Sequence, residues 1–474
     1  MNDSAIAAPG TPSAEAHSTD LPATESSCTP GGRRRHRKSK PFGPGARHAL
    51  VLAMAVPVAS AALAGPSAFA ADGNTVGTTP DSAPDTTTDP DPGDQQMIAN
   101  LTNRITDVRL GDNVSGVVLD AQTDRTLWGH NASTALMPAS NTKLATATAA
   151  LTVLGPNHRF TTKVVYGNGA LTLIGGGDRM LTSDDLAGLA QTAVAGLKAA
   201  GLTTVKVHVD DSLFPEPTLA DGWNDGYYPD SVAPVRALVV DGHGVTDTSI
   251  DAGQVFAQKL AADGITVDGD VTRAQASPTD VPVARHQSPT LADTIHHMLK
   301  VSDNNIAETL LRMTALGAGR PATFEDGTTV VRYVLSKVYG VSLDNFEIHD
   351  GSGLSRANRI PAATLADILD LATEPRYQRI LGPILDGLPI AGEAGSTLGP
   401  EWGRFDDPNS SCAVGKVHAK TGTLTGAIAL SGLTKGTDGH WKVFSFVENG
   451  STAAPNTIKD AMDGLAATVN GCWA

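Results

Sequence analysis

A serine and a lysine lie three residues apart in the segment Pro138-Ala139-Ser140-Asn141-Thr142-Lys143, at the predicted start of a helix. Positions i and i+3 share one face of an α-helix, so the Lys143 amine is expected beside the Ser140 hydroxyl. A desolvated, neutral lysine amine can take the proton of a serine and make it a nucleophile. Because Ser-x-x-Lys also arises by chance, its meaning depends on the other polar segments.

Two further segments complete a set: Ser302-Asp303-Asn304 and Lys420-Thr421-Gly422. Each is common alone, since Ser-Asp-Asn is typical of a turn or helix cap and Lys-Thr-Gly of a loop before a strand. The three motifs in this order resemble the set found in penicillin-binding proteins and class A β-lactamases.

The flanking residues narrow this resemblance. Met137-Pro138-Ala139-Ser140, SDNNIAETLLR, DGSGLSR (350–356) and AKTGTL (419–424) are similar to the D-alanyl-D-alanine carboxypeptidase/endopeptidase family, the low-molecular-mass class C penicillin-binding proteins. The resemblance covers about residues 97–470. Between Lys143 and Ser302 lie 158 residues (144–301), which fits the inserted domains of this family better than a compact β-lactamase.

The resemblance implies an α/β fold, the penicillin-recognising serine-transferase fold, in which helices flank an antiparallel sheet that joins both termini. The sequence agrees: SGVVLDAQTDRTLWG (115–129) predicts a hairpin, and GAIALSGL and WKVFSFVE predict strands after Lys420. The apolar spacing predicts helices over 140–154, 183–200, 291–315 (interrupted by SDNN), 327–338, 363–373 and from about Asn456. We expect a DD-peptidase domain over 97–160 and 291–474, and an inserted region of smaller domains over 161–290.

The family and the chemistry of acyl transfer together imply a role for each motif. Ser140 attacks the carbonyl of the penultimate D-alanine, and Lys143 takes its proton, with burial and the Lys420 charge lowering its pKa. Ser302 passes the proton to the departing amine, while Asn304 holds the substrate backbone and contacts Lys143. The remaining expected binding residues read the C-terminal carboxylate or admit the substrate backbone: Lys420, Thr421 and Thr423 for the carboxylate, Gly422 for close approach.

Three further residues are weaker candidates. Arg356 could pair with a carboxylate on the diamino acid of the substrate, or form an ordinary surface salt bridge. Trp223 and Asp225 could roof the cleft from the inserted region, with Asp225 meeting an ammonium, or could belong to a turn packed by an aromatic ring. The sequence has no His-Glu-x-x-His or other clustered ligands, so we expect no metal and no cofactor.

The N-terminus predicts export. A basic run (33–38) precedes an apolar run (49–64) and an Ala-Phe-Ala site (68–70), the pattern of a secretory signal over 1–70. A cleaved signal and an uncleaved anchor remain alternatives, as does a later start codon. Residues 71–96, rich in Thr, Asp and Pro, predict a disordered linker. An exported protein favours a disulfide between Cys412 and Cys472.

The acidic net charge of the chain argues against nucleic acid as a partner. Of the 35 basic and 50 acidic residues, 28 and 46 lie after residue 70, so the acidic body should not bind nucleic acid. We therefore expect an exported serine hydrolase at the cell wall that acts on peptidoglycan stem peptides ending in D-Ala-D-Ala and is acylated by β-lactam antibiotics. A β-lactamase of the same superfamily and a non-catalytic wall-binding scaffold are the alternatives. The sequence does not decide between carboxypeptidase and endopeptidase action, or the oligomeric state.

Overall fold

The computed structural model describes residues 91–473, so the predicted signal and linker residues 71–90 lie outside the described part. Folded structure begins earlier than the expected Met97, because helix α1 (Pro92–Arg104) starts directly after Asp91. The Asp91 side chain accepts hydrogen bonds from the first backbone N–H groups of this helix, which caps it. Within residues 91–473, no helix combines the length and apolar character that crossing a membrane requires.

A five-stranded sheet forms the base of the structure, with strand order β11-β12-β13-β1-β2 and every pair antiparallel. Its strands come from both ends of the described chain: β1 (Val114–Asp120), β2 (Arg125–His130), β11 (His418–Leu424), β12 (Ala427–Lys435) and β13 (Trp441–Asn449). The predicted hairpin at 115–129 and the sheet joining the two ends are confirmed.

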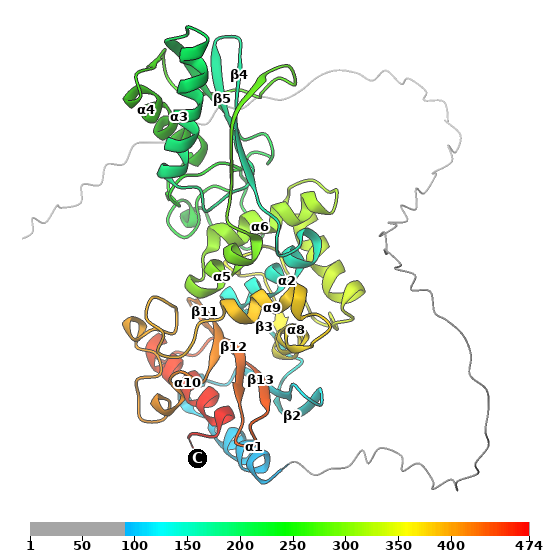
Figure 1. The fold of residues 1–474 in the computed structure, drawn as a ribbon. Coiled ribbons are helices and arrows are strands. Elements are labelled where there is room, and N and C mark those ends of the chain that lie inside the picture. Colours follow the sequence, from blue (N-terminus) through cyan, green and yellow to red (C-terminus); the bar gives the residue numbers. More distant parts are fainter. Residues whose placement is uncertain (1–90, 474) are drawn as a thin grey trace, which may run out of the picture. The chain divides into compact units, whose positions relative to one another are not determined.

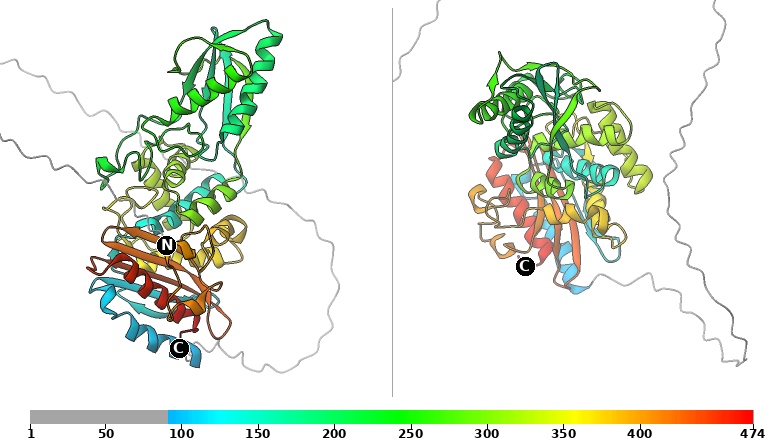
Figure 2. Two further views of the ribbon diagram at one scale, coloured as in Figure 1. Left: turned by 90° about the vertical axis from the view of Figure 1, so that its left-hand side faces the viewer. Right: turned by 45° about the horizontal axis from the view of Figure 1, so that its top comes forward.

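Helices cover both faces of this sheet, and alternation along β13 shows why. Phe444 and Phe446 point into a core with α1 and α10 (Pro455–Asn470), while Val443 and Val447 point to the opposite core. The left view of Figure 2 shows α10 lying along the strands. Another set of helices packs in the opposite core: α2 (Thr142–Leu154), α5 (Leu291–Val301), α6 (Asn304–Gly317), α7 (Phe324–Tyr333), α8 (Ala362–Thr373) and α9 (Gln378–Gly387).

Residues between α2 and α5 build a second, mixed sheet with its own core. Its strands are β4 (Thr161–Gly167), β5 (Ala170–Ile174), β6 (Thr204–Asp210), β7 (Thr266–Val267), β8 (Thr272–Arg273) and β9 (Val281–Gln287). Helices α3 (Ser183–Ala199) and α4 (Thr248–Ala262) pack on it through their apolar faces, as Figure 1 shows.

Every predicted helix is present, and besides α1 two further observed helices are missing from the predictions. The SDNN segment does separate two helices, α5 and α6, and a π-helical turn (Val334–Val338) extends α7 over the predicted range. Helices α4 and α9 were not predicted. Pro383 lies inside α9, and a proline within an apolar pattern normally indicates a break.

Candidate active site

Ser140 lies in a 3₁₀ turn (Ala139–Asn141) that runs directly into α2. The turn is held under backbone constraint, since Ala139 has a φ of 47°, a region that non-glycine residues rarely occupy. The Asn141 amide, oriented so that its oxygen accepts from Ser431 Oγ, donates to the carbonyl of Lys420 at 2.9 Å. The neighbour of the serine thus fixes this turn to strand β11.

The Lys143 amine connects the serine to the second motif. Its Nζ lies 2.9 Å from Ser140 Oγ, 2.7 Å from Asn304 Oδ1 and 2.7 Å from the carbonyl oxygen of Ser352. Both carbonyl oxygens can only accept, so they take two N–H groups of the amine. In a neutral amine the remaining lone pair faces the Ser140 hydroxyl, the arrangement of a general base.

Burial changes the pKa of the Lys143 amine. Lys143 is fully buried, and the loss of solvation lowers its pKa from 10.5 to about 8. Asp350, Glu308 and Asp303 oppose the shift, in that order. The expected effect of burial is therefore present, whereas the three opposing carboxylates were not foreseen in the sequence. A meaningful fraction of Lys143 is neutral near pH 8.

Two buried carboxyl groups hold the backbone that faces Lys143. Glu308 accepts from the N–H groups of Gly351 (3.0 Å) and Ser352 (2.7 Å). Asp350 accepts from the backbone of Gly353 (3.0 Å) and Ser355 (2.6 Å). Burial and, second, the neighbouring Asp350 together raise the pKa of Glu308 to about 7, although Arg312 and the backbone N–H groups oppose the shift. These contacts position the Ser352 carbonyl that accepts from Lys143.

Ser302 and Lys420 form the second polar pair. Ser302 ends α5 in the left-handed region, with a φ of 62°, and Asp303 caps the start of α6. Lys420 Nζ donates to Ser302 Oγ at 2.9 Å and to the Thr421 carbonyl at 2.7 Å. Burial and the nearby Lys143 lower the pKa of Lys420.

Within residues 91–473, strand β11 is an edge of the first sheet, and beyond an isolated bridge between His418 and Ile390 no strand lies along its outer side. Thr421 donates to Thr397 Oγ1 at 2.8 Å, and Thr423 is exposed. The packing gives a reason for glycine at 422 in addition to the predicted approach of the substrate, which stays a prediction. A Cβ there would lie 2.6 Å from the Pro138 carbonyl oxygen, so Gly422 allows β11 to pack against the segment that carries Ser140.

A cavity of about 260 Å³ brings much of this set together. Its lining residues come from all three motifs and from the loop before β11: Ser140, Val301, Ser302, Thr397, Trp402, Arg404, Thr421, Thr423 and Lys459. The other motif side chains do not line the cavity. Lys143 connects to it through Ser140 and also binds Asn304, and Lys420 connects to it through Ser302.

The second sheet's region contacts the site at Asn304, whose Nδ2 donates to the Ser231 carbonyl at 2.9 Å. Trp223 is 9% exposed; its indole N–H donates to Asp350 at 2.8 Å and its ring packs on Tyr227. This placement corresponds to the packed-turn alternative for Trp223. Asp225 is exposed, and neither residue lines the cavity.

Arg356 is exposed and donates to the Thr425 carbonyl at 3.0 Å, just beyond the end of β11. Within residues 91–473 it makes no ion pair, so the salt-bridge alternative does not account for it.

The loop before β11 is tied by two links to α10 and to the residues that follow this helix. Cys412 and Cys472 are joined by a disulfide across 60 residues of sequence. Arg404 forms a buried ion pair with Asp463, in which its Nε lies 2.9 Å from Oδ2. The loop that carries Thr397 and Trp402 is therefore fixed at both of these points.

Acidic side chains gather away from the site, around Lys442. Within residues 91–473, two groups could bring three ligands together, and both include Asp438. The buried Lys442 ammonium lies among them, 2.7 Å from Asp120 and 2.8 Å from Asp438. A cation of the protein already compensates these charges, so they are explained as a structural ion-pair cluster.

Several residues of this site were not singled out in the sequence. Glu308 and Asp350 lie inside the segments SDNNIAETLLR and DGSGLSR, which carried the family resemblance, but their role in holding Lys143 follows only from the fold. Thr397, Trp402 and Lys459 lie in segments without a motif, so no signal in one sequence identifies them.

Comparison with known proteins agrees with this geometry. Residues 97–246 and 242–469 match the D-Ala-D-Ala carboxypeptidase 3 (S13) family. The carboxypeptidase DacB of Mycolicibacterium smegmatis is 32% identical over 76% of this chain and 80% of its own length. The D-alanyl-D-alanine carboxypeptidase of an Actinomadura species is 30% identical over 74% and 80%.

A solved structure shows the same fold. The crystal structure of penicillin-binding protein 4 (dacB) from Haemophilus influenzae has a TM-score of 0.65 and 24% identity, over 79% of this chain and 98% of that one. The same protein in complex with a β-lactam gives a TM-score of 0.59 and 25% identity, with the same coverage. The fold expected from the sequence is thus confirmed, and the chain belongs to the D-Ala-D-Ala carboxypeptidase 3 (S13) family.

Proposed function

We propose that this protein is an exported serine-type D-Ala-D-Ala carboxypeptidase that also cleaves peptide cross-links in peptidoglycan. The observation that carries the proposal is the Lys143 amine, buried and bound by two carbonyl acceptors, with its third position on Ser140 Oγ. Family membership supports the substrate class.

Acylation begins at Ser140. Its Oγ attacks the carbonyl carbon of the penultimate D-alanine while its proton passes to neutral Lys143, and an O–C bond forms. Backbone N–H groups of Ser140 and Thr423 serve as the oxyanion hole. Collapse of the tetrahedral intermediate breaks the amide C–N bond, and the proton reaches the departing nitrogen through Ser302, which Lys420 holds.

The carboxylate of the leaving residue binds at β11, where Lys420 supplies charge and the hydroxyls of Thr421 and Thr423 donate. The substrate backbone pairs with the free edge of β11, near Gly422, and with the Asn304 amide. Water then cleaves the ester and returns the proton to Ser140, with Lys143 again acting as the base.

The proposal also covers Arg356, β-lactam antibiotics and export. Arg356, which has no carboxylate partner within residues 91–473, pairs with an anionic group on the acyl side of the substrate. β-Lactams acylate Ser140 as substrate analogues, in keeping with the β-lactam complex of the Haemophilus relative. The signal pattern in residues 1–70 supports export.

Purified muropeptides test the function. The protein should release D-alanine from pentapeptide monomers and convert cross-linked dimers to monomers, both read by mass spectrometry. Ser140→Ala should do neither, whereas Ser336→Ala, an unrelated surface serine, should act like the wild type. A wild type inactive on both substrates would refute the proposal.

A further inference from the structure

The cavity beside Ser140 extends past the residues that the proposed mechanism uses. Thr421 and Thr423, the proposed carboxylate readers, form one part of its lining. Beyond them it is lined by Val301, Trp402, Arg404 and Lys459, to which no role in the reaction has been given.

In the proposed mechanism this part of the cavity belongs to the leaving-group side of the scissile bond. The terminal carboxylate belongs to the leaving residue, and its proposed readers line this cavity together with Ser302, the proposed proton donor to the leaving nitrogen. Arg356, which is proposed to bind the acyl side of the substrate, does not line it. A side chain on the leaving residue would therefore enter this space.

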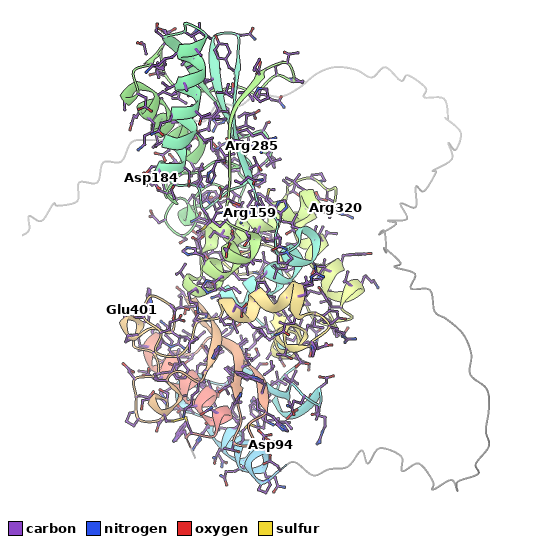
Figure 3. The ribbon with its side chains drawn as sticks, viewed as in Figure 1. Asp94, Arg159, Asp184, Arg285, Arg320 and Glu401 are labelled. Atoms are coloured by element: carbon purple, nitrogen blue, oxygen red, sulfur yellow. A yellow bond between two sulfur atoms is a disulfide. The ribbon has the colours of Figure 1, made fainter. Side chains whose placement is uncertain are left out.

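Two apolar side chains lie open there. Val301 is 41% exposed and Trp402 57%, and both line the same cavity. Trp402 follows Glu401, which Figure 3 labels on this loop and whose carboxylate accepts from the Gly395 N–H at 2.7 Å. The ion pair of Arg404, two residues along the chain, and the disulfide of Cys412 anchor the backbone of the loop that carries Trp402.

A cation completes the lining. Lys459, on α10, is half-buried, and within residues 91–473 it makes no hydrogen bond or ion pair. Burial and the neighbouring Arg404 lower its pKa, and Asp463 and Asp460 offset only part of this. Arg404 is already paired with Asp463, so Lys459 is the cation here that a ligand can neutralise. A bound carboxylate would favour the charged form of Lys459 and so offset the effect of burial.

We infer that Trp402 and Lys459 form a leaving-group subsite for a D-residue with an extended aliphatic side chain that carries a carboxylate. The methylenes lie on Trp402 and Val301, and the carboxylate meets the Lys459 ammonium. Terminal D-alanine has only a methyl side chain, so this subsite would act on substrates whose leaving residue is longer. The inference rests on the proposed function and assigns residues to its endopeptidase arm.

Matched synthetic peptides test the subsite. Acyl-D-Ala-D-Xaa substrates, with Xaa as D-alanine, D-norleucine, D-2-aminoadipate or D-lysine, vary side-chain length and charge separately. The readout is the ratio of kcat/KM values within each protein, which cancels general losses of activity. The wild type should favour aminoadipate over norleucine by about fivefold, as expected for one partly solvated charge pair, and disfavour lysine.

Variants assign the preference to residues. Lys459→Ala should abolish the preference for aminoadipate over norleucine, and Lys459→Glu should reverse the order of aminoadipate and lysine. Trp402→Ala should reduce the advantage of norleucine over alanine. Lys337→Ala, an exposed lysine outside the cavity, is the matched control and should keep the wild-type ratios.

Two results would overturn the inference in distinguishable ways. Cleavage of the D-alanine substrate with equal rates for aminoadipate, norleucine and lysine would refute the subsite and leave the peptidase function standing. Failure to cleave any of the four, with no acylation by penicillin, would refute the proposed function and the subsite with it.

Discussion

At the scale of single residues, the central feature is a lysine that must be neutral to act. Lys143 has a pKa lowered to about 8 by burial, below its ordinary value of 10.5. Below pH 8 the amine is protonated and cannot accept the Ser140 proton, while above it the free base dominates. We expect kcat/KM and the rate of penicillin acylation to rise with pH, with an apparent pKa near 8. A flat profile from pH 6 to 9 would contradict this role.

Glu308 provides a second test at this scale. It touches the backbone of Gly351 and Ser352, and its charge raises the pKa of Lys143. Glu308→Gln removes that charge and keeps one accepting oxygen, so the rising limb of the pH profile should move to lower pH. A purely structural role would lower the rate at every pH without moving the limb. Glu325→Gln, on the first turn of α7, is the control and should leave the limb in place.

Sequence reasoning reached the motif residues but not their supports. Ser140, Lys143, Ser302 and Asn304 were singled out because three short motifs in this order resemble those of a known family, and the structure brings Ser140, Lys143 and Asn304 into contact. Glu308 could not, since a glutamate in a helix is ordinarily solvent-exposed. Only the fold shows that it is buried and faces the turn opposite Lys143.

At the scale of elements, the site depends on close contact between backbones. Gly353 has a φ of 87°, and a Cβ there would collide with the Ala139 carbonyl beside the nucleophile. Gly340 has a similar φ of 76° but open space around its Cα. Gly340→Ala should therefore cost only the backbone strain, about 1 kcal/mol of unfolding free energy.

Gly353→Ala should cost about 2 kcal/mol more than Gly340→Ala, because overpacking adds to the strain, and it should also slow penicillin acylation. Urea unfolding of the two variants measures the difference. Equal unfolding free energies would show that the contact with Ala139 is not tight.

Element types were predictable where periodicity was strong, as in α3 and β13. The packing role of Gly422 could not be predicted. The sequence suggests only that a substrate approaches this glycine, whereas the fold shows that the segment before Ser140 packs against it. The start of the fold at Pro92 was likewise hidden by the Pro- and Asp-rich composition around it.

At the scale of the whole molecule, the residues around Ser140 argue against the β-lactamase alternative. Rapid hydrolysis of a penicilloyl ester needs a second base near the ester. No carboxylate lines the cavity beside Ser140, and Glu308 is fully buried on backbone N–H groups. A chromogenic cephalosporin should give a burst of one equivalent and then little turnover. Sustained rapid turnover would favour the β-lactamase alternative.

The large insertion could be placed by counting residues between motifs, but its contribution to the site could not. Ser231 reaches Asn304, and Trp223 reaches Asp350, through hydrogen bonds that depend on how the two sheets' segments pack. These contacts involve residues more than 70 positions apart, and a single sequence carries no signal for such pairs.

The most direct test of the account is covalent labelling by penicillin, followed by intact-protein and peptide mass spectrometry. The wild type should gain one penicilloyl group on the peptide that contains Ser140, Ser140→Ala should gain none, and Ser336→Ala should label like the wild type. A label on any other residue, or equal labelling of Ser140→Ala, would contradict the assignment of Ser140 as the nucleophile.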